Sequence, residues 1–189
     1  MTGKVIRIVF ITAICVTIST SANANAESPP SREYLIKAAF LYNFAKFVEW
    51  PTEAFPNDST PITLCILGED PFGDALESIK GKTIRGRDMV IRHVVRVEDL
   101  EHCHILFVSA SEEKRLPQIL NTIRDKTILT VSDMNRFARR GGIINLVTVR
   151  SKIRFEINVD ATDLVGLRIS SKLLRLARIV KDGRGEENN

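Results

Sequence analysis

The chain has 189 residues, of which 44% are apolar and 26% are charged. This length and composition are those of one soluble globular domain, and they exclude a disordered chain, a collagen-like repeat and a multi-span membrane protein. The formal net charge of +4 is small, whereas nucleic-acid-binding proteins concentrate basic charge much more strongly. We therefore expect no nucleic-acid partner.

The first 26 residues have the order of a secretory signal peptide. Lys4 and Arg7 form a basic start, residues 8–18 are mainly apolar, and small residues follow. Cleavage fits after Ala24 or after Ala26. The apolar run is shorter than the roughly 20 residues that a membrane-spanning helix needs, which argues against an N-terminal anchor. The sequence therefore predicts an exported protein with a signal peptide over residues 1–26.

Cleavage changes both the charge and the cysteine count. Removal of residues 1–26 leaves 25 basic and 23 acidic residues, a net charge of +2, and it removes Cys15. Cys65 and Cys103 then remain in a compartment that permits disulfides. An even pair predicts a bridge, which would stabilise the fold by about 4 kcal/mol on the chain-entropy model. Two buried thiols are the alternative.

The first element of the mature chain is a predicted helix over residues 34–49, which ends before Pro51. Asn43, Lys46 and Glu49 form one narrow polar stripe, so most of the helix surface is apolar. Such a helix is either buried in the core or docks on another molecule. The partner surface in the second interpretation contains Phe40, Phe44, Phe47 and Trp50.

Strand and helix patterns alternate from residue 62 to residue 138, which predicts a largely parallel sheet covered by helices. A hairpin of residues 143–149 and 153–158 adds antiparallel strands. The predicted strands before it are residues 62–67, 103–108 and 126–131, with extended chain over 82–97. We therefore predict one α/β domain over residues 27–183, with a mixed, mostly parallel sheet, helices on both faces and three layers. Residues 184–189 form a predicted flexible tail.

A last helix is predicted from Lys172 to Val180, with Ser170 and Ser171 as its caps. Lys172, Arg175 and Arg178 recur every three residues, so they would lie on one helix face. A solvated face with cations near the helix C-terminus is one interpretation. A surface for an acidic partner or for anionic headgroups is the other.

Polar side chains follow the predicted parallel strands. Ligands bind at this carboxyl edge in open α/β sheets, which makes a ligand cleft one hypothesis. Ordinary turn and capping interactions are the alternative. The cleft would contain Glu69, Asp70, Ser109, Ser132 and Asp133.

Several chemical motifs are absent or incomplete. The segment 81–83 resembles the end of a phosphate-binding loop but lacks the earlier glycine. His102 and His104 would share one face of a strand while Cys103 points to the other, so they do not form the four-ligand site that zinc prefers. The remaining acids, hydroxyls and histidines show no catalytic spacing. We expect no metal, no cofactor and no catalysis.

Several segments taken together resemble the YfiR family. They follow one another in the family's order and cover essentially the whole predicted mature chain. The segments are Glu33–Pro51, Cys65–Gly73, Cys103–Phe107, Leu129–Asp133, Gly141–Ile144, Arg154–Asn158 and Ile169–Ala177. The resemblance implies that the family's cysteine pair falls on Cys65 and Cys103. A second pair, which some members carry nearer the C-terminus, is absent from this sequence.

The resemblance also implies a function. Proteins similar to YfiR are periplasmic and have no known catalytic activity. They repress an inner-membrane diguanylate cyclase by binding its periplasmic sensor domain, and an outer-membrane lipoprotein can sequester the repressor. The resemblance therefore predicts a periplasmic repressor of cyclic-di-GMP synthesis with these two partners. A periplasmic small-ligand-binding module is the alternative, a hydrolase is a weaker one, and a homodimer stays open.

Overall fold

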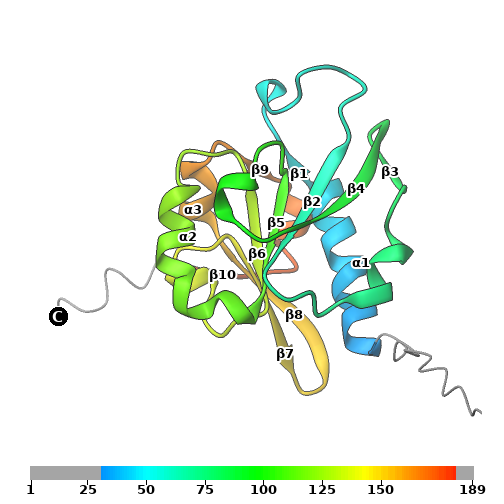
Figure 1. Cartoon of the computed structure of the whole chain (residues 1–189). Helices are drawn as coiled ribbons and strands as arrows, with labels where there is room; N and C mark the ends of the chain where they lie inside the picture. Colours follow the sequence, from blue (N-terminus) through cyan, green and yellow to red (C-terminus); the bar gives the residue numbers. More distant parts are fainter. Residues whose placement is uncertain (1–30, 182–189) are drawn as a thin grey trace, which may run out of the picture.

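The computed structural model describes residues 31–181 (Figure 1). The predicted signal peptide with Ala24 and Ala26, and the predicted tail 184–189, lie outside these residues. Within residues 31–181, no helix is both long enough and apolar enough to cross a bilayer.

The domain is built on an eight-stranded sheet with the strand order β10-β8-β7-β6-β5-β2-β4-β3. The β3–β4 and β7–β8 pairs are antiparallel, and the other five neighbouring pairs are parallel. The strands are β2 (Ile62–Leu67), β3 (Thr83–Ile84), β4 (Arg87–Val94), β5 (Ile105–Val108), β6 (Leu129–Ser132), β7 (Ile144–Val149), β8 (Lys152–Asn158) and β10 (Arg178–Val180). This arrangement confirms the predicted mixed, mostly parallel sheet and the predicted hairpin.

Helices cover both faces of the sheet, which confirms the predicted three-layer α/β class. Figure 1 shows α1 on one side of the sheet and α2 on the other. The α-helices are α1 (Arg32–Phe47), α2 (Leu116–Thr122), α3 (Val159–Leu164) and α4 (Ser171–Leu174). Short 3-10 helices occupy η1 (Thr52–Ala54), η2 (Gly73–Ser78), η3 (Val97–Asp99), η4 (Ala110–Arg115) and η5 (Ala138–Arg140).

Helix α1 begins where the sequence provides a cap. The Ser31 side chain accepts a hydrogen bond from the backbone N–H of Tyr34, and Glu33 and Lys46 stand at the helix ends that favour their charges. The helix ends two residues before its predicted end. The next two residues form β1 (Val48–Glu49), which pairs with β9 (Arg168–Ile169) in a small antiparallel sheet.

Two hydrophobic cores lie on opposite faces of the sheet because side chains alternate along each strand. In β2, Leu64 and Ile66 pack in the core beneath α1, while Cys65 and Leu67 pack in the core beneath α2. Each of these four side chains is fully buried. The continuous apolar run of β2 therefore reflects a strand covered on both faces.

The predicted helix over residues 172–180 is wrong. Helix α4 ends at Leu174, and the chain then extends into β10, which pairs with β8 and places Arg178 opposite Glu156. Pairing gives this backbone hydrogen-bond partners, and β-branched Ile179 and Val180 suit a strand. Lys172, Arg175 and Arg178 therefore do not share one helix face.

Candidate functional site

At the carboxyl edge of the sheet, the serines of the predicted ligand cleft make short-range contacts within the domain. The Ser132 hydroxyl donates to the carbonyl of Val108 at 2.7 Å and accepts from the N–H of Met134 at 3.0 Å. Ser109 caps η4 and accepts from the N–H of Ser111. These are turn and capping interactions, which was the alternative interpretation.

The crevice between β2 and β5 is also filled. Gly68 follows β2 with a φ of +89°, and a Cβ placed on it would lie 2.4 Å from Oγ of Ser111. The same hydroxyl accepts a hydrogen bond from the N–H of Glu69 at 3.0 Å. Oδ2 of Asp70 contacts Nε2 of His93 at 2.7 Å. The loop after β5 therefore packs directly against the loop after β2.

Asp133, the fifth residue of the predicted cleft, faces α1. Its Oδ2 accepts hydrogen bonds from Nζ of Lys37 at 2.6 Å and from the Tyr34 hydroxyl at 3.1 Å. Burial lowers the pKa of Lys37, but the hydrogen bonds to Asp133 and Glu33 and the charge of Asp133 raise it, and the net effect is a raised pKa. Burial and the neighbouring Asp133 raise the pKa of Tyr34. The cluster is therefore a charged bridge within the domain.

The aromatic residues of α1 belong mainly to the core, so the core-helix interpretation holds. Phe44 is 0% exposed, and it cannot be part of a partner surface. Phe40 is half-buried and its ring packs edge-on against Phe155 at 5.6 Å between centroids. Phe47 and Trp50 are also half-buried against the same core.

His104 is a buried neutral histidine with both ring nitrogens in use. Its Nδ1 accepts from the N–H of Thr63 at 3.1 Å, and its Nε2 donates to the carbonyl of Ala54 at 3.2 Å. The ring stacks on Phe55 with 4.6 Å between centroids. Burial is the main cause that lowers its pKa. His102 is exposed with a φ of +62°, so the two histidines do not converge.

Cys65 and Cys103 form a disulfide with 5.9 Å between their Cα atoms and a sequence separation of 38. This Cα separation is ordinary for a disulfide. Both cysteines belong to the core beneath α2. The bridge connects the middle of β2 to the segment that enters β5, which confirms the predicted pairing.

A basic surface covers the outer part of β7, β8 and β10 on the side away from α1; we call it the basic face. Lys152 pairs with Val149 and Arg154 with Val147 in the β7–β8 hairpin, so these side chains share one face with Arg178. Lys152, Arg154 and Arg178 are exposed. In the sequence, the basic residues Lys152 and Arg154 flank the apolar Ile153. This alternation predicts a strand with one basic face.

Few negative charges balance the basic face. Arg178 pairs with the buried Glu156. Within the described part of the chain, neither Lys152 nor Arg154 makes an ion pair. Residues 136–181 contain eleven Lys and Arg but only three Asp and Glu. The positive charge of the predicted mature protein is therefore concentrated in the C-terminal part of the domain.

Comparison with known protein families matches residues 34–178 to the YfiR/HmsC-like family. This chain belongs to that family. The match runs from the first turn of α1 to the start of β10, so it covers nearly all of the described domain.

Membership in the YfiR/HmsC-like family supports a periplasmic regulator in cyclic-di-GMP signalling that interacts with a membrane-associated signalling protein. Among residues 31–181, no group of three or more His, Cys, Asp or Glu converges in a way that could hold a metal ion. The side chains of Asp70, Ser109, Ser132 and Asp133 have hydrogen-bond partners within the domain. Glu69 and the basic face are exposed.

Proposed function

We propose that this protein is a periplasmic regulator that binds the periplasmic sensor domain of an inner-membrane diguanylate cyclase and represses cyclic-di-GMP synthesis. The observation that carries the proposal is the YfiR/HmsC-like match over residues 34–178. Export through the signal peptide over residues 1–26 is part of the proposal. We also propose that the protein has no catalytic activity. The possible homodimer stays a prediction.

Repression requires the regulator to bind one state of the sensor domain more tightly than the other. A ligand shifts a two-state equilibrium only by its difference in affinity for the two states. The disulfide and the Lys37–Asp133 ion pair connect separate elements of the domain, which favours a rigid binding surface. An outer-membrane lipoprotein that binds the same regulator would compete with the sensor domain and release the cyclase.

The basic face is the surface that we assign to the sensor domain. Lys152, Arg154 and Arg178 are exposed beside Val149, which is 51% exposed. Complementary charge accelerates encounter and selects among partners. We therefore expect an acidic patch on the sensor domain. This assignment replaces the surface of α1 aromatics and the helical basic stripe.

Deletion of the gene tests the function directly. We expect cyclic-di-GMP, measured by mass spectrometry of cell extracts, to rise in the deletion strain and to return to the original level when the full chain is restored. A chain without residues 1–26 should not restore it, because that chain would stay in the cytoplasm. Unchanged cyclic-di-GMP in a deletion strain that carries an active cyclase with a periplasmic domain would contradict the proposal.

A periplasmic small-ligand-binding module is the second candidate function. Ser109, Ser132 and Asp133 of the predicted cleft already have partners within the domain. A different feature favours it: a groove at the opposite edge of the sheet, between α2 and α3.

A further inference from the structure

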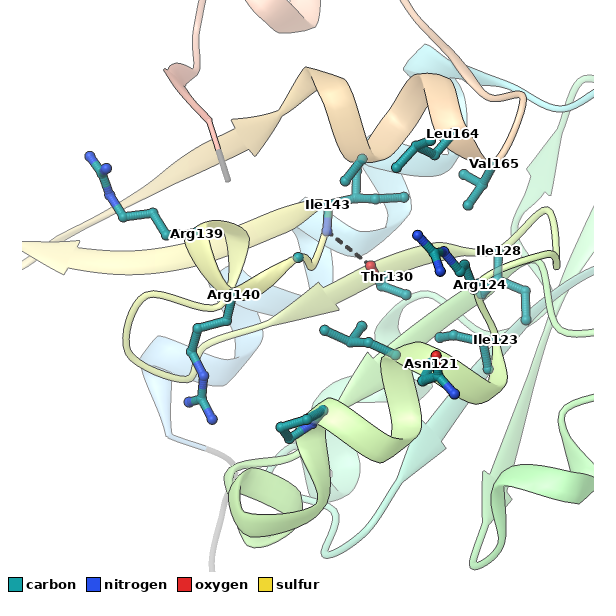
Figure 2. A pocket seen from close by; sticks show the side chains of 14 residues that line it. Asn121, Ile123, Arg124, Ile128, Thr130, Arg139, Arg140, Ile143, Leu164 and Val165 are labelled. Atoms are coloured by element: carbon teal, nitrogen blue, oxygen red, sulfur yellow. Dashed lines mark hydrogen bonds between the residues drawn. The ribbon is translucent and has the colours of Figure 1, made fainter. Parts of the chain in front are cut away.

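The groove between α2 and α3 has the size of a small-molecule site. Its volume is about 330 Å³, and ligand pockets generally measure roughly 300–1,000 Å³. Ile128 and Ile143, which line it, immediately precede β6 and β7. The groove therefore lies at the amino ends of these strands, on the edge of the sheet away from the strand-end turns. Figure 2 shows the two helices as its opposite walls.

The walls of the groove are mainly apolar. Ile128, Ile143 and Val165 line it together with Leu164, which is 67% exposed. Thr130 lies at its floor, where its Oγ1 accepts a hydrogen bond from the N–H of Ile143 at 2.9 Å (Figure 2). The floor hydroxyl therefore already has a partner within the protein. An apolar ligand that covers Leu164 would remove exposed apolar surface from water.

The charged residues that line the groove are all basic. They are Arg124, Arg139 and Arg140, and no Asp or Glu lines it. Asp125 and Asp163 neighbour lining residues in sequence but are not part of the lining. A groove with this lining favours an anionic ligand over a neutral or cationic one.

The three arginines differ in how far they are already engaged. Arg140 pairs with Oε1 of Glu113 at 3.0 Å. Over residues 31–181, neither Arg124 nor Arg139 has an ion-pair partner. Figure 2 shows the Arg124 side chain reaching between the two walls, while Arg139 and Arg140 come from η5 at the other end. Arg124 is therefore the residue placed to meet an anionic headgroup.

We propose that this groove binds a small anion with an apolar body, of the kind that a medium-chain fatty acid represents. The carboxylate would accept hydrogen bonds from the Arg124 guanidinium, which suits carboxylates in geometry and charge. The chain would pack on Ile128, Ile143, Leu164 and Val165. This ligand site goes beyond the proposed repression of a cyclase, since it needs no partner protein, and it names the ligand class for the second candidate function.

Decanoate below its micelle-forming concentration is a suitable probe, and isothermal titration calorimetry of the purified oxidised protein is a suitable measurement. We expect saturable binding with one site per chain. Decanol, which lacks the charge, and acetate, which lacks the apolar body, should each bind at least about tenfold more weakly. For decanol, the loss of a charge-assisted hydrogen bond corresponds to about a tenfold weaker affinity. For acetate, the loss of the apolar contacts has the same direction.

Variants locate the site. Arg124→Gln should weaken decanoate binding by about tenfold, and Leu164→Asp should weaken it further by placing a carboxylate at the mouth. Arg96→Gln, an exposed change on the loop after β4, is the matched control and should leave binding unchanged. Both groove positions are exposed, so these variants should fold.

Three results would overturn the assignment. They are no decanoate binding at millimolar concentration, equal binding of decanol, and unchanged binding in both groove variants, which would place the ligand elsewhere. All of these are measured on the purified protein alone. Failure here therefore leaves the proposed repression of a cyclase untouched, and the deletion experiment remains its separate test.

Discussion

Nζ of Lys37 lies 2.6 Å from Oδ2 of Asp133, so one ion pair joins α1 to the loop that follows β6. The Lys37 side chain is only 5% exposed, and Glu33 contacts the same nitrogen at 2.6 Å. Removal of one member of a buried pair leaves the other charge without compensation, which costs more than the pair itself contributes.

Lys37→Met should therefore lower the free energy of unfolding by about 2–4 kcal/mol. The matched control is Lys46→Met, at an exposed position in the last turn of the same helix, which should change stability by less than about 0.5 kcal/mol. Urea unfolding followed by tryptophan fluorescence measures both. Asp133→Asn added to Lys37→Met should recover part of the loss. Equal midpoints for Lys37→Met and Lys46→Met would contradict the role of the pair.

The disulfide should contribute about 4 kcal/mol, the value that the chain-entropy model gives for this loop, which closes over a sequence separation of 38 residues. We expect Cys65→Ala/Cys103→Ala to unfold at a clearly lower urea concentration than the oxidised protein. Reduction of the wild-type protein should shift its midpoint in the same direction. Coincident unfolding curves for the oxidised protein and the double variant would show that the bridge contributes no stability.

Much of the fold follows from local sequence signals. The apolar runs of β2, β5 and β6 predicted buried strands, and each is covered on both faces. The two cysteines of the predicted mature chain form the disulfide. The strands were predictable because burial on both faces of a strand requires an uninterrupted apolar run. The disulfide was predictable because only two cysteines remain in the predicted mature chain.

The incorrect predictions concern residues whose structure depends on contacts with parts of the chain that are distant in sequence. The spacing of Lys172, Arg175 and Arg178 suits a helix, but the chain from Arg178 pairs with the edge of β8 as a strand. Asp133 looked like a ligand-binding acid because its partner, Lys37, lies 96 residues away in sequence. The polarity of a strand-end side chain cannot show whether it faces solvent or another element. Pairing and packing across the chain supply that information.

His104 should make the stability of the protein depend on pH. Burial lowers its pKa in the folded state, while the unfolded chain has the ordinary value near 6.5. Below about pH 6.5 the unfolded state binds a proton that the folded state does not, so the free energy of unfolding falls as pH falls. The contribution is complete above the unfolded pKa and is lost as pH drops toward the folded pKa.

The measurement is urea unfolding between pH 5 and pH 7.5. His104→Gln should lower stability and flatten the pH dependence over this range. An equal slope in wild type and His104→Gln would show that another group causes the dependence.

Gly142 is restricted by packing. A Cβ at this position would lie 2.1 Å from Cε1 of Phe137, whose ring is fully buried. Gly142→Ala should therefore destabilise the domain by about 2–3 kcal/mol, because the buried ring or the backbone must shift to admit the methyl group. Gly86→Ala is the comparison: its φ of +81° is unfavourable for alanine, but no atom lies within 4 Å of the added Cβ.

Gly86→Ala should cost only about 1 kcal/mol, the price of a left-handed backbone in a non-glycine residue. Thermal unfolding of the two variants separates steric clash from backbone strain. If Gly142→Ala were no more destabilised than Gly86→Ala, the turn before β7 would have to adapt to the added methyl group.

Charge reversal on the basic face tests the partner surface. In a strain deleted for the gene, Lys152→Glu/Arg154→Glu should fail to return cyclic-di-GMP to the wild-type level. Both side chains are exposed and make no ion pair in the described domain, so the fold should be retained. Repulsion between like charges at an interface costs several kcal/mol, enough to reduce binding by about a hundredfold or more.

The control variant is Lys80→Glu/Lys114→Glu, which makes the same charge change at exposed positions elsewhere and should repress fully. Immunoblots of periplasmic fractions must show equal amounts of all variants. Full repression by Lys152→Glu/Arg154→Glu would show that the basic face does not bind the sensor domain. The repressor function would then require another surface of the protein.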